Sequence, residues 1–298
     1  MNFIKIRVFF LILIFIFLLS LPLYAESLSF RLDQSKIKLS ISPGASQAGE
    51  IKVYSQSDEV IKLKVYLEDW VYSNPLDGSK NFSPAGSNSN SCAPWINFNP
   101  TEFKLPPYGV TIINYIVNVP KTAAGGYYAV MFFETSFDQA KNSELTGQNE
   151  IKSGVGLALR LGSLFYVEAK DTLKRSAELS NFFVMKEEKN KYLSISCDFK
   201  NVGNTYITVA SSFHIMDKQS LVRARGEFNE GYTFPQDKVT LKSAWKNPIP
   251  QGKYDLVITL DLGKAQQEAN LSRGPILVKE TNIEIGADGE VVRVGELQ

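Results

Sequence analysis

One stretch of 40 residues constrains the fold more than any other part of the chain. It runs from Trp95 to Glu134 and reads WINFNPTEFKLPPYGVTIINYIVNVPKTAAGGYYAVMFFE. The breaks Pro-Pro-Tyr-Gly and Lys-Thr-Ala-Ala-Gly-Gly divide it into three runs, each of which predicts a β-strand. The middle run alternates with a period of two, which is typical of a strand with one buried face. Its predicted inner face carries Ile113, Tyr115, Val117 and Val119, and its outer face carries Ile112, Asn114, Ile116 and Asn118.

The first 25 residues have the layout of a secretory signal peptide. Lys5 and Arg7 precede an apolar run, and Ala25 offers a small residue before the charged Glu26. We expect cleavage after Ala25 and export to the periplasm, the outer surface or the extracellular space. The same apolar stretch is almost long enough to span a bilayer, so retention as an uncleaved anchor is the alternative. If the signal is cleaved, the mature chain carries no apolar run that predicts a stable membrane span.

The net charge and the length of the chain limit the kinds of partner and the number of domains. The chain has 32 Lys plus Arg and 31 Asp plus Glu, a balance that argues against a nucleic-acid partner. Without the signal peptide, a length of roughly 270 residues suggests two domains of ordinary size. We place an N-terminal domain at 26–172 and a C-terminal domain at 173–298.

Both predicted domains are rich in strand patterns. Residues 60–70 alternate most clearly, since Ile61, Leu63, Val65 and Leu67 share one face. A polar loop follows at about 73–93, and a second polar loop lies at about 138–153. Many short strands with turn residues between them predict an all-β fold of two tandem immunoglobulin-like β-sandwiches. The remaining predicted strands are 28–41, 50–55, 154–170, 178–185, 191–200, 206–216, 252–263, 275–285 and 291–294.

The residues that could carry chemistry do not form a recognisable catalytic or metal-binding pattern. Cys92 and Cys197 lie in different predicted domains, so a disulfide between them is not favoured, and neither has a partner at metal-ligand spacing. His214 is the single histidine and has no nucleophile motif around it. The adjacent Glu68 and Asp69 point to opposite faces of a strand, unlike a glycosidase pair. We therefore predict no enzymatic activity, no metal and no cofactor.

The order of strands resembles that of a known family. The Trp-Ile run followed by Pro-Thr-Glu-Phe-Lys-Leu-Pro-Pro, the Gly-Gly-Tyr-Tyr-Ala-Val-Met-Phe-Phe-Glu strand and the closing Leu-Phe-Tyr strand are similar to those of periplasmic pilus-assembly (fimbrial) chaperones. Those proteins consist of two tandem immunoglobulin-like domains. The same features also look like WxL-interacting cell-surface proteins, which usually carry a C-terminal membrane segment, whereas the sequence pattern here predicts none.

The chaperone resemblance implies a way of binding. Such a chaperone lends the last strand of its first domain to an incomplete sandwich in an exported subunit, with main-chain hydrogen bonds for affinity and alternating apolar side chains for register. The alternative is that these side chains fill the chain's own core. The loop at 138–153 could also cover the strand when no partner is present. The candidate partner-binding residues are Val155, Leu157, Leu159 and Leu161, together with Arg31 and Arg160.

One position departs from the family pattern. The family holds a subunit's terminal carboxylate with an Arg on the first strand and a Lys on the last. Arg31 could stand for the Arg, but Ser163 occupies the position of the Lys, and Arg160 lies three residues away. A hydroxyl makes no charge-assisted bond of the same strength, so the carboxylate anchor is not carried over.

The preferred function is a non-catalytic exported chaperone or adaptor that captures an extended segment of a secreted or pilus-type subunit or of a surface protein. The alternative is an envelope binding module that contacts peptidoglycan, the cell wall or another surface protein. Trp70, Tyr127 and Tyr128 could form an aromatic platform for glycan, but aromatic residues on sandwich strands are usually core residues or cross-strand pairs, and we expect that role here.

Overall fold

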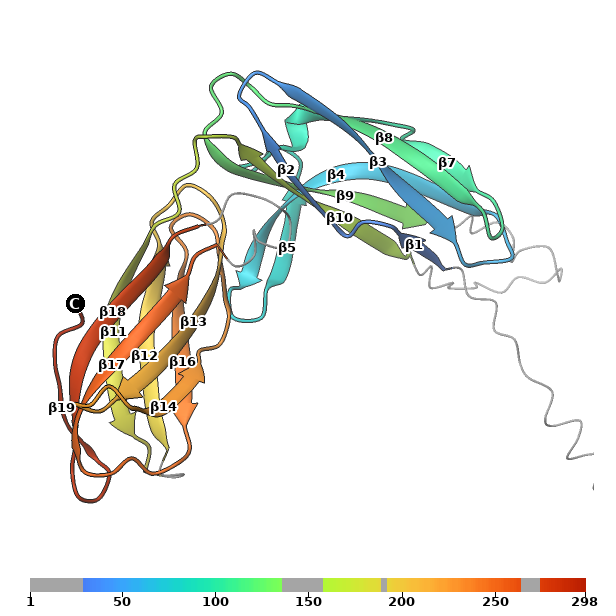
Figure 1. The fold of residues 1–298 in the computed structure, drawn as a ribbon. Coiled ribbons are helices and arrows are strands. Elements are labelled where there is room, and N and C mark those ends of the chain that lie inside the picture. Colours follow the sequence, from blue (N-terminus) through green and yellow to red (C-terminus); the bar gives the residue numbers. More distant parts are fainter. Residues whose placement is uncertain (1–28, 136–157, 189–191, 264–273) are drawn as a thin grey trace, which may run out of the picture.

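The computed structural model describes residues 29–135, 158–188, 192–263 and 274–298. The predicted signal peptide, Val155, Leu157 and the predicted loop at 138–153 lie outside the described residues. Within the described ranges the regular elements are β-strands and one short 3₁₀ helix, which confirms the predicted all-β fold class. The strands form four sheets, arranged as two β-sandwiches that lie at an angle to each other (Figure 1).

The first sandwich contains strands β1 to β10, in two sheets. The four-stranded sheet has the order β1 (Phe30–Leu32), β3 (Ser46–Ser55), β8 (Val110–Asn118) and β6 (Ile96–Asn99). The other sheet has the order β2 (Lys36–Ile41), β10 (Arg160–Ala169), β9 (Gly125–Thr135), β4 (Ile61–Asn74) and β5 (Ser79–Pro84), and β7 (Glu102–Leu105) also pairs with β4.

The second sandwich contains strands β11 to β19. Its three-stranded sheet has the order β11 (Ala177–Lys186), β12 (Leu193–Asn201) and β16 (Lys238–Trp245). The facing sheet has the order β14 (Val222–Glu227), β13 (Ile207–Met216), β17 (Gly252–Asp261), β18 (Ile276–Ile285) and β19 (Val291–Val294), and β15 (Gly231–Thr233) pairs with β13. The proposed domain boundary at residue 172 lies between the last strand of one sandwich and the first strand of the other, and it stays a prediction.

Each sandwich has its own hydrophobic core, because each sheet must cover its apolar face with the other sheet. In the first core, Ile113 and Val117 of β8 face Phe133 of β9 and Phe165 of β10 among buried neighbours. In the second core, Phe213 of β13 and Leu256 of β17 are among the buried residues. The alternation expected for β8 is confirmed, since Ile113, Tyr115 and Val117 are buried while Ile112, Asn114 and Ile116 are exposed.

Three local predictions were wrong. The Trp95 run is not one strand: Trp95 ends a 3₁₀ helix (η1, Ala93–Trp95), and a cis Asn99–Pro100 bond separates β6 from β7, which belong to different sheets. The expected polar loop at 73–93 contains β5, which pairs with the end of β4. The expected strand at 28–41 is two strands, because the chain changes sheet between Leu32 and Lys36. Strands β14, β15 and β16 were not predicted either.

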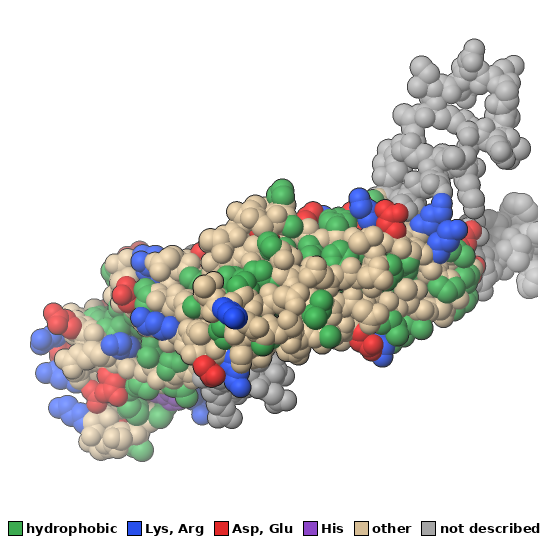
Figure 2. Space-filling model, turned by 90° about the horizontal axis from the view of Figure 1, so that it is seen from above, with side chains coloured by type: hydrophobic (Ala, Val, Ile, Leu, Met, Phe, Trp, Pro, Cys, Tyr) green, Lys and Arg blue, Asp and Glu red, His purple; other side chains and the backbone are tan. Residues whose placement is uncertain are grey.

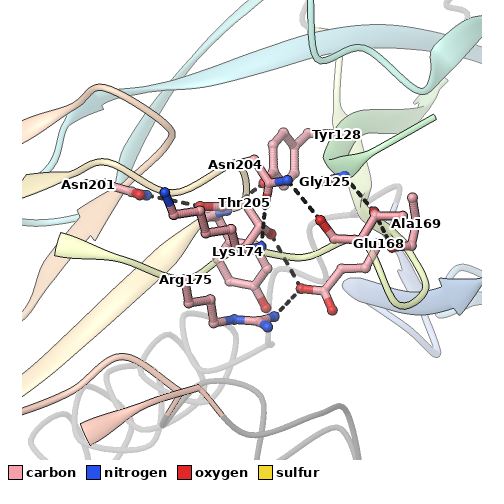
Figure 3. A network of polar contacts seen from close by, with 11 residues as sticks. Gly125, Tyr128, Glu168, Ala169, Lys174, Arg175, Asn201, Asn204 and Thr205 are labelled. Carbon is pink, nitrogen blue, oxygen red and sulfur yellow. Dashed lines mark hydrogen bonds and ion pairs between the residues drawn. The ribbon is translucent and has the colours of Figure 1, made fainter. Parts of the chain in front are cut away.

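A polar network joins the two sandwiches near the linker (Figure 3). Glu168 of β10 and Arg175 form an ion pair of 2.5 Å, and their side chains are only 1% and 4% exposed. Asn204 binds both sides of the linker, since its side-chain nitrogen donates to the Thr172 carbonyl and its side-chain oxygen accepts from the Lys174 amide. The second sandwich is therefore attached through several contacts and not through the linker alone.

The surface carries charges of both signs. In Figure 2 the Lys and Arg side chains are interspersed with Asp and Glu, and this face has no continuous area of one charge. Among the described residues, no helix is long enough and apolar enough to cross a membrane.

Candidate partner-binding edge

Strand β10 is the element that the candidate residues share. It pairs antiparallel with β9 along its whole length, from Arg160 opposite Glu134 to Ala169 opposite Gly125. On its other side it pairs in parallel with β2, but only from Leu164 onward. The N-terminal part of β10, residues 160–163, therefore has a neighbouring strand on one side only among the described residues.

The hydrogen-bond pattern shows which backbone groups face that free side. The Thr135 amide donates to the Leu159 carbonyl, so the backbone N–H and C=O groups of odd-numbered residues along β10 point toward β9. The Leu164 amide donates to the Ser35 carbonyl, so the backbone groups of even-numbered residues point to the opposite side of the strand, away from β9. Backbone groups alternate in direction along a strand. The N–H and C=O groups of Arg160 and Gly162 thus form an open edge, with no backbone partner in the part of the chain that the structure describes.

The open edge exists because the chain preceding β2 comes from the other sheet. Strand β1 pairs with β3, and the Asp33 amide still donates to the Lys52 carbonyl of that strand. The chain crosses to β10 only at Ser35. At the crossing, the Ser163 hydroxyl donates to the Gln34 carbonyl and closes the end of the open edge. Ser163 therefore has a structural role, because its hydroxyl joins β10 to the segment that precedes β2.

The side chains of the open edge divide between two faces. Leu159 and Leu161 are partly buried and pack against the first hydrophobic core. The backbone amide of Leu159 is held by the Thr135 hydroxyl at 3.1 Å. These two leucines therefore form the rim of the core, where a further strand would continue both the sheet and its apolar face.

Arg160 lies on the outer face and is fixed by its surroundings. Its guanidinium carbon is 4.1 Å from the centroid of the Phe132 ring and 5.4 Å from that of Phe82. It also donates to the Tyr66 hydroxyl at 3.3 Å and contacts the Glu68 carboxylate at 3.4 Å. The bond to the Tyr66 hydroxyl is the main reason that the pKa of Arg160 is raised, while burial raises the pKa of Tyr66.

Arg31 does not join this group. It belongs to β1, in the opposite sheet, where it pairs with Tyr54 of β3 and its guanidinium carbon lies 4.0 Å from the centroid of that ring. The structure thus brings together Leu159, Arg160 and Leu161, and it places Arg31 on a different sheet. The assignment of all these residues to partner binding stays a prediction.

The residues considered for catalysis have structural surroundings. Glu68 faces Arg160 on the outer face, while Asp69 is fully buried and accepts hydrogen bonds from residues 86–91. His214 is half-buried on β13, opposite Val257 and Arg225 of its neighbouring strands. No group of three or more His, Cys, Asp or Glu side chains in the described ranges has a geometry suited to a metal ion.

The two cysteines are buried and free, each in the core of a different sandwich. Burial raises the pKa of the Cys92 thiol and raises that of Cys197 to about 12. Because the two thiols are buried in different cores, their positions agree with the expectation against a disulfide between them.

The aromatic residues considered for a glycan platform are packed against other side chains, as is usual for aromatic residues on sandwich strands. Trp70 is 1% exposed and Tyr128 is 3% exposed, and Tyr127 packs on Trp95 at a ring distance of 4.2 Å. Trp70 and Tyr128 belong to a third buried group, called here the aromatic cluster, on the outer face of the β10 sheet. Sequence reasoning missed it, although Tyr66, Trp70 and Tyr72 alternate along β4 as a second apolar face would. The cluster consists of Trp70, Tyr128, Val130, Phe132, Tyr166, Tyr206 and Phe234.

Comparison with known sequences gives no match. No protein-family model matches the chain, and no curated protein matches it.

Comparison with solved structures finds similar chains. A class 5 fimbriae chaperone, CfaA, has a TM-score of 0.48 at 14% identity, covering 85% of this chain and 98% of its own. The Escherichia coli chaperone DraB has a TM-score of 0.38 at 13% identity, covering 79% and 93%. The Salmonella enterica SafA pilin–SafB chaperone complex has a TM-score of 0.38 at 13% identity, covering 85% and 97%. All three of these solved structures contain a chaperone, and each is similar to this chain at low sequence identity.

Proposed function

We propose that this protein is a non-catalytic, exported chaperone or adaptor that captures an extended segment of an exported subunit by strand addition. The segment would pair with the open edge of β10 and lie end to end with β2. The observation that carries the proposal is the absence of a strand beside residues 160–163, in the described part of the chain, where β2 has not yet begun.

The chemistry of the edge supports this binding mode. An unpaired strand edge offers main-chain donors and acceptors to any extended peptide, and natural proteins normally cover such edges. Here the backbone groups of Arg160 and Gly162 point outward from the sheet, while Leu159 and Leu161 continue the core. An added strand with alternating apolar residues would gain hydrogen bonds and would bury its apolar side chains against these leucines.

The residues around the open edge hold this part of β10 in a fixed conformation before a partner binds. Arg160 is held by Phe132, Phe82, Tyr66 and Glu68, and Leu159 is held by Thr135. A strand that is already fixed loses less conformational entropy when a partner pairs with it. The edge would therefore act as a preformed template.

Two variants of one residue test the proposal. Arg160→Pro removes the amide donor of the open edge, and since that amide faces away from β9, the ladder with β9 keeps its bonds. Arg160→Ala removes the side chain and keeps the donor. Tagged mature protein would be isolated from its native envelope after photo-crosslinking, and the crosslinked partner would be quantified. We expect Arg160→Pro to lose the partner and Arg160→Ala to retain most of it.

Equal capture by both variants would contradict strand addition. Leu159→Glu gives a second test, because a carboxylate at the rim would oppose an apolar segment, and Ile112→Glu, on the exposed outer face of β8, is its matched control. Retention on purified cell wall at moderate salt, unchanged by Arg160→Pro, would favour the envelope-binding alternative instead.

A further inference from the structure

A two-stranded ribbon leaves the first sandwich. Strand β4 pairs with β9 only as far as Glu68 opposite Val130, but it continues to Asn74 and pairs with β5 over this extension. The ribbon is defined here as residues 69–84. In Figure 1 it projects into the inner corner between the sandwiches, where β5 is labelled. An isolated two-stranded ribbon is marginally stable in water, so its order requires support from elsewhere.

The second sandwich supplies that support at the tip of the ribbon. The Tyr232 amide of β15 donates to the Pro75 carbonyl at 2.7 Å. The Tyr232 ring lies over the tip at Gly78, where a Cβ atom would meet it at 3.3 Å, and it is 5.7 Å from the Tyr72 ring. The tip is thus held by a backbone bond and by ring packing at once.

The stem of the ribbon makes a second set of contacts. The ring of Phe234, which follows β15, is 4.9 Å from Tyr72 and 5.0 Å from Trp70. Phe234 also stacks on Tyr128 of β9 at 4.2 Å, so it lies between the ribbon and the first sandwich. Trp70, Tyr128 and Phe234 belong to the aromatic cluster, and Tyr72 packs against it, so these contacts stabilise the ribbon and the second sandwich together.

We infer that the ribbon is a strap that holds the two sandwiches in one orientation. The linker network at Glu168, Arg175 and Asn204, together with the bond from the Tyr206 amide to the Tyr128 hydroxyl, holds the sandwiches at the linker end of their contact. The strap supplies a second point from a different part of the chain, through Tyr72, Tyr232 and the Pro75 carbonyl. This role concerns the orientation of the sandwiches and does not depend on partner capture.

Distance measurements between the sandwiches test the strap. Spin labels would be attached through Lys104→Cys on β7 and Lys218→Cys in the second sandwich, both exposed positions. The native thiols of Cys92 and Cys197 are buried and stay unlabelled. Pulsed electron paramagnetic resonance should give one narrow distance distribution for the otherwise native chain. Tyr72→Ala should broaden it, because the ring contacts of the ribbon with Tyr232 and Phe234 are lost.

Phe183→Ala is the matched control, since this ring is exposed on β11, and it should leave the distribution narrow. Hydrogen exchange of β8 and β13 amides would show that both cores stay folded. If Tyr72→Ala loosened a core, Tyr232→Ala, which removes a half-exposed ring from the opposite side, would decide the question. A narrow, native distribution in Tyr232→Ala with both cores intact would overturn the strap.

Discussion

Asp69 shows how one buried side chain organises a loop. Strand β4 leaves β9 after Glu68, and residues 90–92 take its place beside Tyr128. Asp69 holds this loop, because its carboxylate accepts bonds from the Gly86 amide at 3.2 Å, the Asn88 amide at 2.8 Å and the Ser91 hydroxyl at 2.5 Å. A buried carboxylate is stable only with such donors.

Replacing Asp69 by Ala should therefore lower the free energy of unfolding by about 2–4 kcal/mol, since the part-buried amides of Gly86 and Asn88 and the buried Ser91 hydroxyl lose their acceptor. Urea unfolding would measure the change. Asp58→Ala, at an exposed position, is the control and should change stability by less than about 0.5 kcal/mol. A loss below about 1 kcal/mol for Asp69→Ala would mean that water replaces the carboxylate at the loop.

At the scale of the strand, Gly162 has a packing reason to be glycine. An added Cβ atom would lie 2.8 Å from Cγ2 of Val130 and 3.0 Å from Cε1 of Phe132, and both of these side chains are buried. Phe132 therefore leans across β10 at Gly162, in the position that also supports Arg160.

We expect Gly162→Ala to destabilise the protein. Overpacking costs about 1–3 kcal/mol, which exceeds the ~0.4–1 kcal/mol that Ala contributes by restricting the unfolded chain. Thermal or urea unfolding of a double-mutant cycle with Phe132→Leu provides the check, since a smaller side chain at 132 should reduce the penalty at 162. An unchanged penalty in the Phe132→Leu background would contradict the proposed contact.

At the scale of the whole molecule, the buried ion pair of Glu168 and Arg175 lies where the second sandwich is attached to the first. Burial raises the pKa of Glu168 above its ordinary value, and the charge of Arg175 opposes this shift. The Thr205 hydroxyl, from the second sandwich, also donates to the same carboxylate at 3.4 Å. The Glu168 carboxylate of the first sandwich is thus neutralised by Arg175 and also bonded to Thr205 of the second sandwich (Figure 3).

Removing one partner should be costly and pH-dependent. In Arg175→Met, Glu168 loses its counter-charge, and unfolding stability should fall by about 3–5 kcal/mol at neutral pH. In this variant the pKa of Glu168 in the folded state rises further above the unfolded value of about 4.3. Stability from a carboxyl with a raised pKa is fully present below the unfolded pKa and is lost as pH rises through the folded one. Urea unfolding from pH 4 to pH 8 should therefore show Arg175→Met weakening as pH increases.

The double variant Glu168→Leu/Arg175→Met is the control, because replacing both charges by apolar groups removes the imbalance. It should recover most of the stability and should lack the steep pH dependence. A pH profile of Arg175→Met parallel to that of the native chain would contradict the assignment.

The sequence by itself determined the fold class and many of the strands. Alternation of side chains is a local property of the chain, and it is retained wherever one face of a strand is buried, as in β8 and β17. The same alternation along Leu159, Arg160 and Leu161 was enough to predict that the two leucines share a face and that the arginine lies on the other.

Only the tertiary structure decided which strands pair and where pairing stops. The open edge depends on β2 joining β10 at Leu164, and the strap depends on β5 forming in a stretch whose polar residues indicate a loop. The aromatic cluster combines β4, β9 and β10 with Tyr206 and Phe234 of the second sandwich. Such contacts join residues far apart in the chain, and local periodicity has no information about them, because register and sheet order are set by long-range packing.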